Sequence, residues 1–307
     1  MKVHFGFDQE VKELGRTVAS LGNYDGVHMG HQAVLKRAVE QARKCSVPSV
    51  AITFDPVPKK ILYPQSAAPL LQTLQQRLHK MEALHLDHTI VVAFDQSFAR
   101  KTPQEFVKEY LLGILRIQGF VVGRNFSFGH QKKGNVSLLQ EMGREHDFWV
   151  EGIPEIQING MRISSTLIRE LVRNGKMEEA AMYLGSPFAL IGKIVGGEQV
   201  GGKLGIPTAN LDAENELLPG NGVYVTKAIL SSRAYPSVTN VGIRPTFGGE
   251  KLTVEAHLLD ETSNLYGQQM ELEFLYKLRE EIRFPNIEAL KHQIQSDINA
   301  ARAYFAR

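Results

Sequence analysis

Short apolar runs alternate with amphipathic segments through the first half of the chain, and this alternation constrains the fold more than any other feature. The runs lie at 17–22, 48–54, 88–94, 118–123 and 147–153, and segments with helical spacing of apolar residues lie between them at 31–45, 71–86 and 102–115. Thr102 is expected to cap the third helix, with Pro103 at its first position and Glu105 completing a capping box. Continuous apolar runs are typical of parallel strands buried on both faces, so this order predicts an α/β domain with a parallel sheet between helices.

The pattern changes near residues 184–192, where glycine and proline become frequent and helices no longer separate the strands. Strands are expected at 189–195, 222–230, 237–242, 252–259 and 269–278, followed by a closing helix at 286–305. A chain of 307 residues also exceeds the usual size of a single core. We therefore expect two domains, an α/β domain at 1–185 and an antiparallel β-barrel domain at 186–307.

Composition excludes several classes of protein. The net charge of +2 gives no general reason to expect a nucleic-acid partner. Cys45 is the only cysteine, so an internal disulfide and a thiolate zinc site are both excluded. The first residues do not follow the pattern of a secretory signal, and no apolar run approaches a membrane span, so no membrane partner and a cytoplasmic location are expected.

The segment GNYDGVHMGH, residues 22–31, follows the first expected strand and leads into the first expected helix. Ligands of open α/β sheets bind at this end of the strands. Gly22 and Gly26 allow a turn and a close approach of the backbone, and a helix N-terminus favours anions. His28 and His31 are candidates for metal or phosphate binding, and the lack of further clustered metal ligands favours phosphate.

A second polar cluster lies in RISSTLIRE, residues 162–170. Ser164, Ser165 and Thr166 stand at the expected start of a helix, and Arg169 follows one turn later. The hydroxyls could cap the helix or contact an anion, and the guanidinium could hold a phosphate.

These motifs, together with TFDPVP at 53–58 and GRNFSFG at 123–129, resemble the bacterial FAD synthetases of the HxGH nucleotidyltransferase superfamily. The resemblance implies a Rossmann-like nucleotidyltransferase domain that transfers AMP from ATP to FMN and releases pyrophosphate, with His28, His31 and Arg169 as catalytic residues. It implies nucleotide or phosphate contacts at Gly22, Asn23, Asp25, Gly26, Ser164, Ser165 and Thr166, and flavin contacts at Asn125, Phe126 and Phe128. Two alternatives stay open here: core packing for the two phenylalanines, and a turn rather than support of a magnesium site for Asp25.

The segment GKLGIPTANLD, residues 202–212, is the corresponding feature of the second domain. Thr208 and Asn210 lie two apart, so on an extended chain both point the same way and offer oxygen ligands of the kind that Mg²⁺ prefers. Together with TNVGIRPTFGG, VEAHLLD and LREEIRF further on, this segment resembles riboflavin kinase. That resemblance implies an antiparallel β-barrel with a closing helix, transfer of the γ-phosphoryl of ATP to riboflavin, and Glu255 as the base.

The riboflavin kinase resemblance also implies ligand contacts. Mg²⁺ is assigned to Thr208 and Asn210, the nucleotide to Gly201, Lys203 and Gly205, and the edge of the flavin pocket to Arg279, Glu281 and Phe284.

The chain departs from the pattern of these families at three places. Val57 stands where a histidine is usual, Lys132 stands beside Lys133 in place of an arginine, and Gly202 replaces an arginine, with Lys203 one position further on. We therefore carry three hypotheses: an enzyme that makes FMN and then FAD, with ATP, riboflavin, FMN and FAD as its ligands; an FMN adenylyltransferase with a weakened flavin-binding kinase module; and a flavin-binding regulatory protein.

Overall fold

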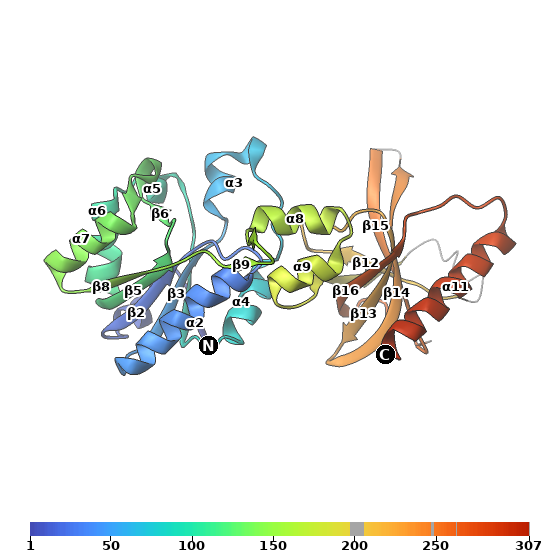
Figure 1. Cartoon of the computed structure of the whole chain (residues 1–307), viewed down its shortest axis with the longest axis horizontal. Coiled ribbons are helices and arrows are strands. Elements are labelled where there is room, and N and C mark those ends of the chain that lie inside the picture. The colour runs from blue at the N-terminus through green and yellow to red at the C-terminus, as the bar shows by residue number, and fades with distance from the viewer. Residues whose placement is uncertain (197–205, 247–248, 262, 307) are drawn as a thin grey trace. The chain divides into compact units, whose positions relative to one another are not determined.

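The chain folds into two compact units (Figure 1). The computed structural model describes residues 1–196, 206–246, 249–261 and 263–306. The first unit comprises Met1–Pro69 and Leu74–Ser164, and the second comprises Leu70–Thr73 and Ser165–Arg307. Each unit is described by itself below.

The first unit is built on a six-stranded parallel sheet with the order β1-β4-β3-β2-β5-β8. Its strands are β1 (Lys2–Phe5), β2 (Thr17–Leu21), β3 (Ser49–Phe54), β4 (His88–Val92), β5 (Ile117–Gly123) and β8 (Trp149–Ile153). From β2 the chain adds β3 and β4 on one side, and it then returns to the other side of β2 for β5 and β8. In open α/β sheets, ligands commonly bind in the crevice at such a reversal of strand order, which here lies at the carboxyl ends of β2 and β5.

Helices cover both faces of this sheet (Figure 1). Helices α2 (Met29–Lys44) and α4 (Leu74–Glu82) pack on one face, where Val18 of β2 lies against Ala38 of α2. The other face packs against α6 (Pro103–Phe106), the π-helix η2 (Val107–Ile114) and α7 (Val136–His146), and it includes Ala19 and Phe120. Successive residues of β2 therefore face different cores, and all five residues of this strand are buried.

Smaller elements complete the first unit. The helical ones are α1 (Gln9–Lys12), α3 (Pro58–Leu62), η1 (Pro64–Ser66), α5 (Gln96–Ala99) and η3 (His130–Lys132). Two short antiparallel pairs join β6 (Ser127–Phe128) to β7 (Gly134–Asn135) and β9 (Gln157–Ile158) to β10 (Met161–Arg162).

The second unit is a closed antiparallel barrel with the order β11-β12-β15-β14-β13-β16. Its strands are β11 (Phe188–Val195), β12 (Ala209–Ala213), β13 (Gly222–Leu230), β14 (Arg233–Thr246), β15 (Gly249–Leu258) and β16 (Gln269–Arg279), and its helices are α8 (Ser165–Arg173), α9 (Met177–Leu184) and α11 (Ile287–Phe305). Ile298 and Ala301 of α11 share a core with Val223 and Val225 of β13. The closing helix therefore packs on the barrel wall, while Tyr224 and Phe274 contact each other in a T-shaped pair.

The predicted fold class is confirmed, with differences in detail. The five predicted strands of the first unit are all present, and Thr102 and Glu105 form the expected capping box at the start of α6. The predicted helix at 102–115 is present, and after one turn of α-helix in α6 it continues as the π-helix η2. β1, α7, α9 and several of the shortest elements were not predicted, whereas β12 lies in the segment 202–212 that was expected to be extended.

Candidate active sites

The loop between β2 and α2 carries the first candidate site at the crevice end of the sheet. Gly26 has φ of 89° and lies beside Val27, whose φ of 41° is also left-handed. Gly22 packs against the ring of Tyr24, where an added Cβ would lie 2.9 Å from ring carbons. The loop is therefore tightly turned around a buried tyrosine, and the two glycines are required for that turn.

His28 and His31 form a stacked pair at the start of α2. Their ring centroids are 3.6 Å apart with an interplanar angle of 16°, and Tyr24 lies edge-on to His31 at 5.4 Å. His28 is the N-cap residue, and its Nδ1 accepts a hydrogen bond from the backbone N–H of His31 at 3.3 Å. A neutral His28 ring therefore carries its proton on Nε2, which is free of that capping bond and able to donate.

Burial keeps both rings neutral. Burial, together with the nearby charge of Lys80, lowers the pKa of His28 to about 4. Burial, followed by the neighbouring His28, lowers the pKa of His31 well below its usual range. Nδ1 of His31 is buried without a hydrogen-bond partner among the described residues. The pair thus offers neutral N–H donors rather than positive charge, and it includes a buried polar atom of the kind that a ligand can satisfy.

The titration of His28 predicts a pH dependence of stability. The unfolded chain binds a proton on this ring near pH 6.5, whereas the folded chain does so only near pH 4. The free energy of unfolding should therefore fall by up to about 1.4 kcal/mol per pH unit on acidification between these values. His28→Asn keeps a good N-cap and should flatten this slope in urea unfolding at pH 7 and pH 5. An unchanged slope would contradict the assignment.

Arg77 of α4 ties the loop between β2 and α2 to the end of β3, and sequence reasoning missed it. Its side chain is fully buried. Its Nη1 donates to the carbonyl of Asn23 at 2.9 Å, and its guanidinium also reaches Thr53, the carbonyl of Phe54 and the carboxylate of Asp55, at 3.2–3.3 Å. The only signal in the sequence was a charged residue on the apolar stripe of a helix, between Leu74 and Met81.

The other predicted residues of the first unit lie in different settings. Asp25 is buried in the loop. Asn125 is exposed and donates to Glu155 at 2.6 Å. Phe126 is half-buried and stacks on Phe128 at 5.5 Å, while Phe128 belongs to the sheet core. Core packing is therefore shown for both phenylalanines, and their flavin contact stays a prediction.

The cluster ISSTLIR lies where α8 begins. The helix starts at Ser165, as predicted, with Ser164 preceding it and Thr166 and Arg169 within its first turns. Ser164 closes the first unit, and Ser165 opens the second segment of the other. The phosphate contacts expected of these four residues stay predictions.

The barrel brings three polar residues of neighbouring strands into one row, two of them predicted from the sequence. Strand register pairs Asn210 of β12 with Glu255 of β15, and it pairs Glu255 with Asn240 of β14. Residues paired in this way lie on one face of a sheet, about 4.5–5.5 Å apart between Cβ atoms. All three side chains are half-buried, whereas the flanking Val254 and Ala256 are fully buried. Asn240, which sequence reasoning missed, extends the predicted pair by one strand.

Further contacts fix the ends of this row. His257 Nδ1 donates to the carbonyl of Pro207 at 2.7 Å, which fastens the segment just before Thr208 to β15. At the other end, Asn240 Nδ2 donates to Glu281 Oε1 at 3.3 Å. A Cβ added to Gly242 would lie 2.2 Å from the same oxygen, so a side chain there would displace the carboxylate of Glu281.

Arg279 has a structural partner. Its guanidinium makes three hydrogen bonds of 2.7–3.2 Å to the carboxylate of Asp297 in α11, and it lies 5.9 Å from the ring centre of Phe284. Arg279 therefore anchors the closing helix to β16. Its contact with a flavin stays a prediction. Gly201, Gly202, Lys203 and Gly205 lie outside the described residues.

Comparison with known proteins places both sites in one family. The FAD synthetase model matches residues 10–167, and the riboflavin kinase model matches residues 184–305. A bifunctional riboflavin kinase/FMN adenylyltransferase of Haemophilus influenzae is 35% identical over 306 residues, which is 99% of each chain. The chain belongs to the bifunctional riboflavin kinase/FMN adenylyltransferase family.

Other relatives agree with this membership. A protein of the same description from Pseudomonas fluorescens is 37% identical over 290 residues, 94% of this chain and 93% of its own. A crystal structure described as a macrolide-efflux protein from Streptococcus pneumoniae has a TM-score of 0.89 at 28% identity, covering 98% of this chain and 99% of that one. The word efflux belongs to the description of that protein and is not carried over to the present chain. In the described part of the present chain, no helix is long and apolar enough to cross a membrane.

The structure describes the surroundings of two of the departures from the family pattern, Val57 and the Lys132–Lys133 pair. Val57 is buried and precedes α3 without a side-chain capping bond. Lys132 and Lys133 are both exposed at the end of η3. Their effect on activity stays a prediction, as does the domain boundary at 185, which lies next to the start of the riboflavin kinase match at 184.

Proposed function

We propose that this chain makes FMN from riboflavin and ATP at the polar row of the barrel, and FAD from FMN and ATP at the histidine loop of the first unit. The two activities follow from membership of the family, and both modules are matched, so a monofunctional or purely regulatory protein is not favoured. The observation that carries the assignment of residues is the register that pairs Asn210, Glu255 and Asn240 across three strands.

In the kinase reaction, the 5′-oxygen of riboflavin attacks the γ-phosphorus of ATP, the bond to the bridging oxygen breaks, and ADP leaves. The proton of the alcohol passes to the carboxylate of Glu255, which acts as general base. Asn240 lies opposite Glu255 on β14 and donates to Glu281, and we assign Asn240 the support of the orientation of the base.

Family membership implies nucleotide substrates and typically a divalent metal, and we assign Mg²⁺ to Thr208 and Asn210. Hydroxyl and amide oxygens suit this ion, and Asn210 is paired with the proposed base, so the donor set fits. When bound, Mg²⁺ neutralises charge on the transferred phosphates. Gly201, Lys203 and Gly205 are proposed to contact the nucleotide, and Arg279, Glu281 and Phe284 to border the flavin.

In the adenylyl transfer, an oxygen of the FMN phosphate attacks the α-phosphorus of ATP, and the bond to the bridging oxygen breaks to release pyrophosphate. No covalent enzyme intermediate is needed, so the protein contributes position and electrostatic stabilisation. His28 and His31 supply neutral N–H donors at the N-terminus of α2, where the backbone also favours anions. Asn23, Asp25 and the loop glycines are proposed to complete the nucleotide contacts.

The proposal also assigns phosphate contacts to Ser164, Ser165, Thr166 and Arg169, and flavin contacts to Asn125, Phe126 and Phe128. The hydroxyls lie at the beginning of a helix of nine residues, which suits an anion.

A time course with riboflavin, ATP and Mg²⁺ tests the function directly. We expect FMN to appear first and FAD to follow, and added FMN should give FAD without riboflavin. Formation of FAD from added FMN, but no FMN from riboflavin, would contradict the kinase assignment. Formation of neither product would contradict both assignments.

Arg77→Met tests the link between the two loops of the first unit. The change removes the charged donor from the carbonyls of Asn23, which keeps the hydroxyl of Thr53, and of the buried Phe54, and a hydrogen bond from a charged group contributes about 1.5–3 kcal/mol. FAD formation should fall at least tenfold, because about 1.4 kcal/mol of lost positioning already gives that factor. FMN formation should stay unchanged. Gln75→Met, on an exposed position of the same helix, is the control, and equal rates in the two variants would rule out a positioning role.

A further inference from the structure

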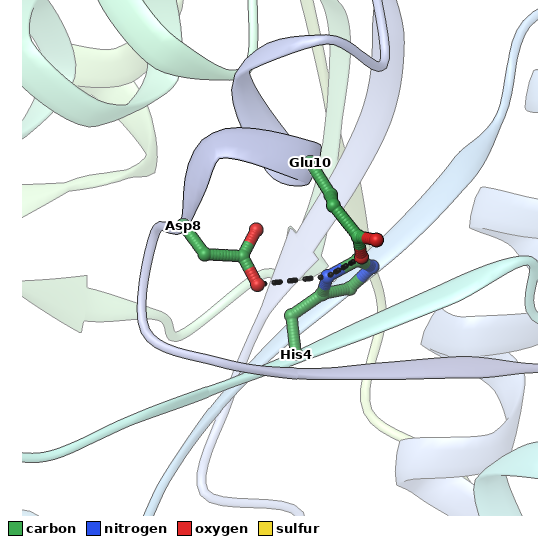
Figure 2. A group of neighbouring side chains, drawn as sticks. All are labelled: His4, Asp8 and Glu10. Atoms are coloured by element: carbon green, nitrogen blue, oxygen red, sulfur yellow. Dashed lines mark hydrogen bonds and ion pairs between the residues drawn. The ribbon is translucent and has the colours of Figure 1, made fainter.

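A cluster of metal-binding side chains lies on β1 and α1, outside the residues assigned to either reaction (Figure 2). Nδ1 of His4 is 3.3 Å from Oδ2 of Asp8 and 3.7 Å from Oε2 of Glu10, and all three donor atoms lie within 4.8 Å of one another. Ligand atoms that each lie about 2.0–2.2 Å from one zinc ion are separated by a little over 3 Å. The two separations measured from His4 match such a set, and small rotations of the exposed carboxylate side chains can adjust the third.

Local structure presents these three groups in a fixed way. His4 lies on β1 with only 2% of its surface exposed, so its ring has little freedom. Asp8 is the N-cap residue of α1, where its Oδ1 accepts from the backbone N–H of Val11 at 2.8 Å. The cap leaves Oδ2 directed at the imidazole (Figure 2). Glu10 follows in the first turn of the same short helix.

His88 orients the ring of His4. Nε2 of His4 and Nδ1 of His88 are 3.1 Å apart. Histidine ligands of metals commonly donate their second N–H to an acceptor of this kind, which fixes the tautomer. In the tautomer of His4 that carries its proton on Nε2, the lone pair of Nδ1 faces two carboxylates, and a cation bound between them would satisfy all three groups.

We propose that His4, Asp8 and Glu10 bind one transition-metal dication, with His88 as the positioning residue behind His4. One imidazole nitrogen and two carboxylate oxygens suit Zn²⁺, Co²⁺, Ni²⁺ or Mn²⁺, whereas Mg²⁺ and Ca²⁺ prefer oxygen ligands alone. Bound there, the ion ties α1 to β1, the strand at the edge of the sheet. Its role is structural and separate from the ion assigned to the kinase reaction.

Substitution of Lys2 should raise metal affinity, the opposite of the change expected when a ligand is removed. Its Nζ lies 2.7 Å from Oε2 of Glu10, the same oxygen that faces His4. Both side chains of this pair are largely exposed, so the pair is weak, and the ion must displace the ammonium. Lys2→Gln should therefore strengthen metal binding, whereas the loss of either carboxylate should weaken it.

The experiment uses the full chain, treated with a chelator and then dialysed into buffer without metal. Zn²⁺ is titrated by calorimetry, and Co²⁺ by its visible absorption. We expect one ion per chain, with affinity reduced at least tenfold in Asp8→Asn, which keeps the helix cap, and in Glu10→Gln at an exposed position. His146→Asn, on an exposed position of α7, should bind as the unchanged protein does.

His88 variants separate positioning from simple loss of stability. His88→Leu removes the acceptor and should weaken Zn²⁺ binding by about 10–100-fold, and His88→Gln should restore part of the loss. Saturating Mg²⁺ should leave the Zn²⁺ titration unchanged. The proposal is overturned if Zn²⁺ does not bind, or if it binds equally well to the unchanged protein, Asp8→Asn and Glu10→Gln. Either result would leave a proton on Nδ1 as the cation between the two carboxylates.

Discussion

Glu255→Gln is expected to lower the rate of FMN formation by about 10²–10⁴-fold, which is the usual contribution of a general base. The amide cannot accept the proton of the ribityl alcohol, although it keeps the size of the side chain and its place opposite Asn210 and Asn240. FAD formation from added FMN should stay unchanged, because His28 and His31 lie in the other compact unit. Both rates are measured on one preparation by following flavins over time.

Two matched variants make this result specific. Glu288→Gln removes a carboxylate from an exposed position at the start of α11 and should leave both rates unchanged. Asn240→Ala keeps Glu255 and removes its neighbour, so a smaller loss of FMN formation is expected. If Glu255→Gln retained more than about a tenth of the kinase rate, the base would have to be another residue, because that loss is below the range expected for a general base.

The parallel sheet was predictable because its strands are apolar on both faces. Residues of β2 enter two different cores in turn, so the sequence at 17–22 shows little alternation and reads as a central strand. β1 was not predicted because it lacks a continuous apolar run. It has four residues, includes Lys2 and His4, and lies at an edge, so its pairing with β4 comes from contacts 86 residues away along the chain rather than from its own pattern.

The sequence predicted most residues of the two sites but not how these residues are arranged in space. Family resemblance singled out Glu255 and Asn210, but only the register of β12, β15 and β14 shows that they are neighbours and adds Asn240. Register depends on pairing between distant strands and cannot be read from spacing along one strand. The capping role of His28 depends on the residue at which α2 begins, and the neutrality of both histidines depends on burial; the motif HxGH encodes neither.

His31→Phe is expected to lower FAD formation by about 10²–10³-fold, as the loss of one hydrogen-bond donor to a transition state commonly does. Phenylalanine can keep the stacking on His28, now 3.6 Å between ring centres, and the edge contact with Tyr24, but it has no N–H. Since His28 rather than His31 caps α2, the helix should begin at the same residue. The buried Nδ1 without a partner also disappears, so the free energy of unfolding should not fall.

The combination of an unchanged fold, a lost N–H and an intact kinase makes the outcome decisive. FMN formation from riboflavin should proceed at its normal rate in His31→Phe, and FMN should then accumulate. His79→Phe, on an exposed position of α4, is the control for the introduction of an aromatic ring. If His31→Phe converted FMN to FAD within about tenfold of the normal rate, the neutral histidine pair would be a structural feature of the loop, and donation to phosphate would rest on the backbone at the start of α2.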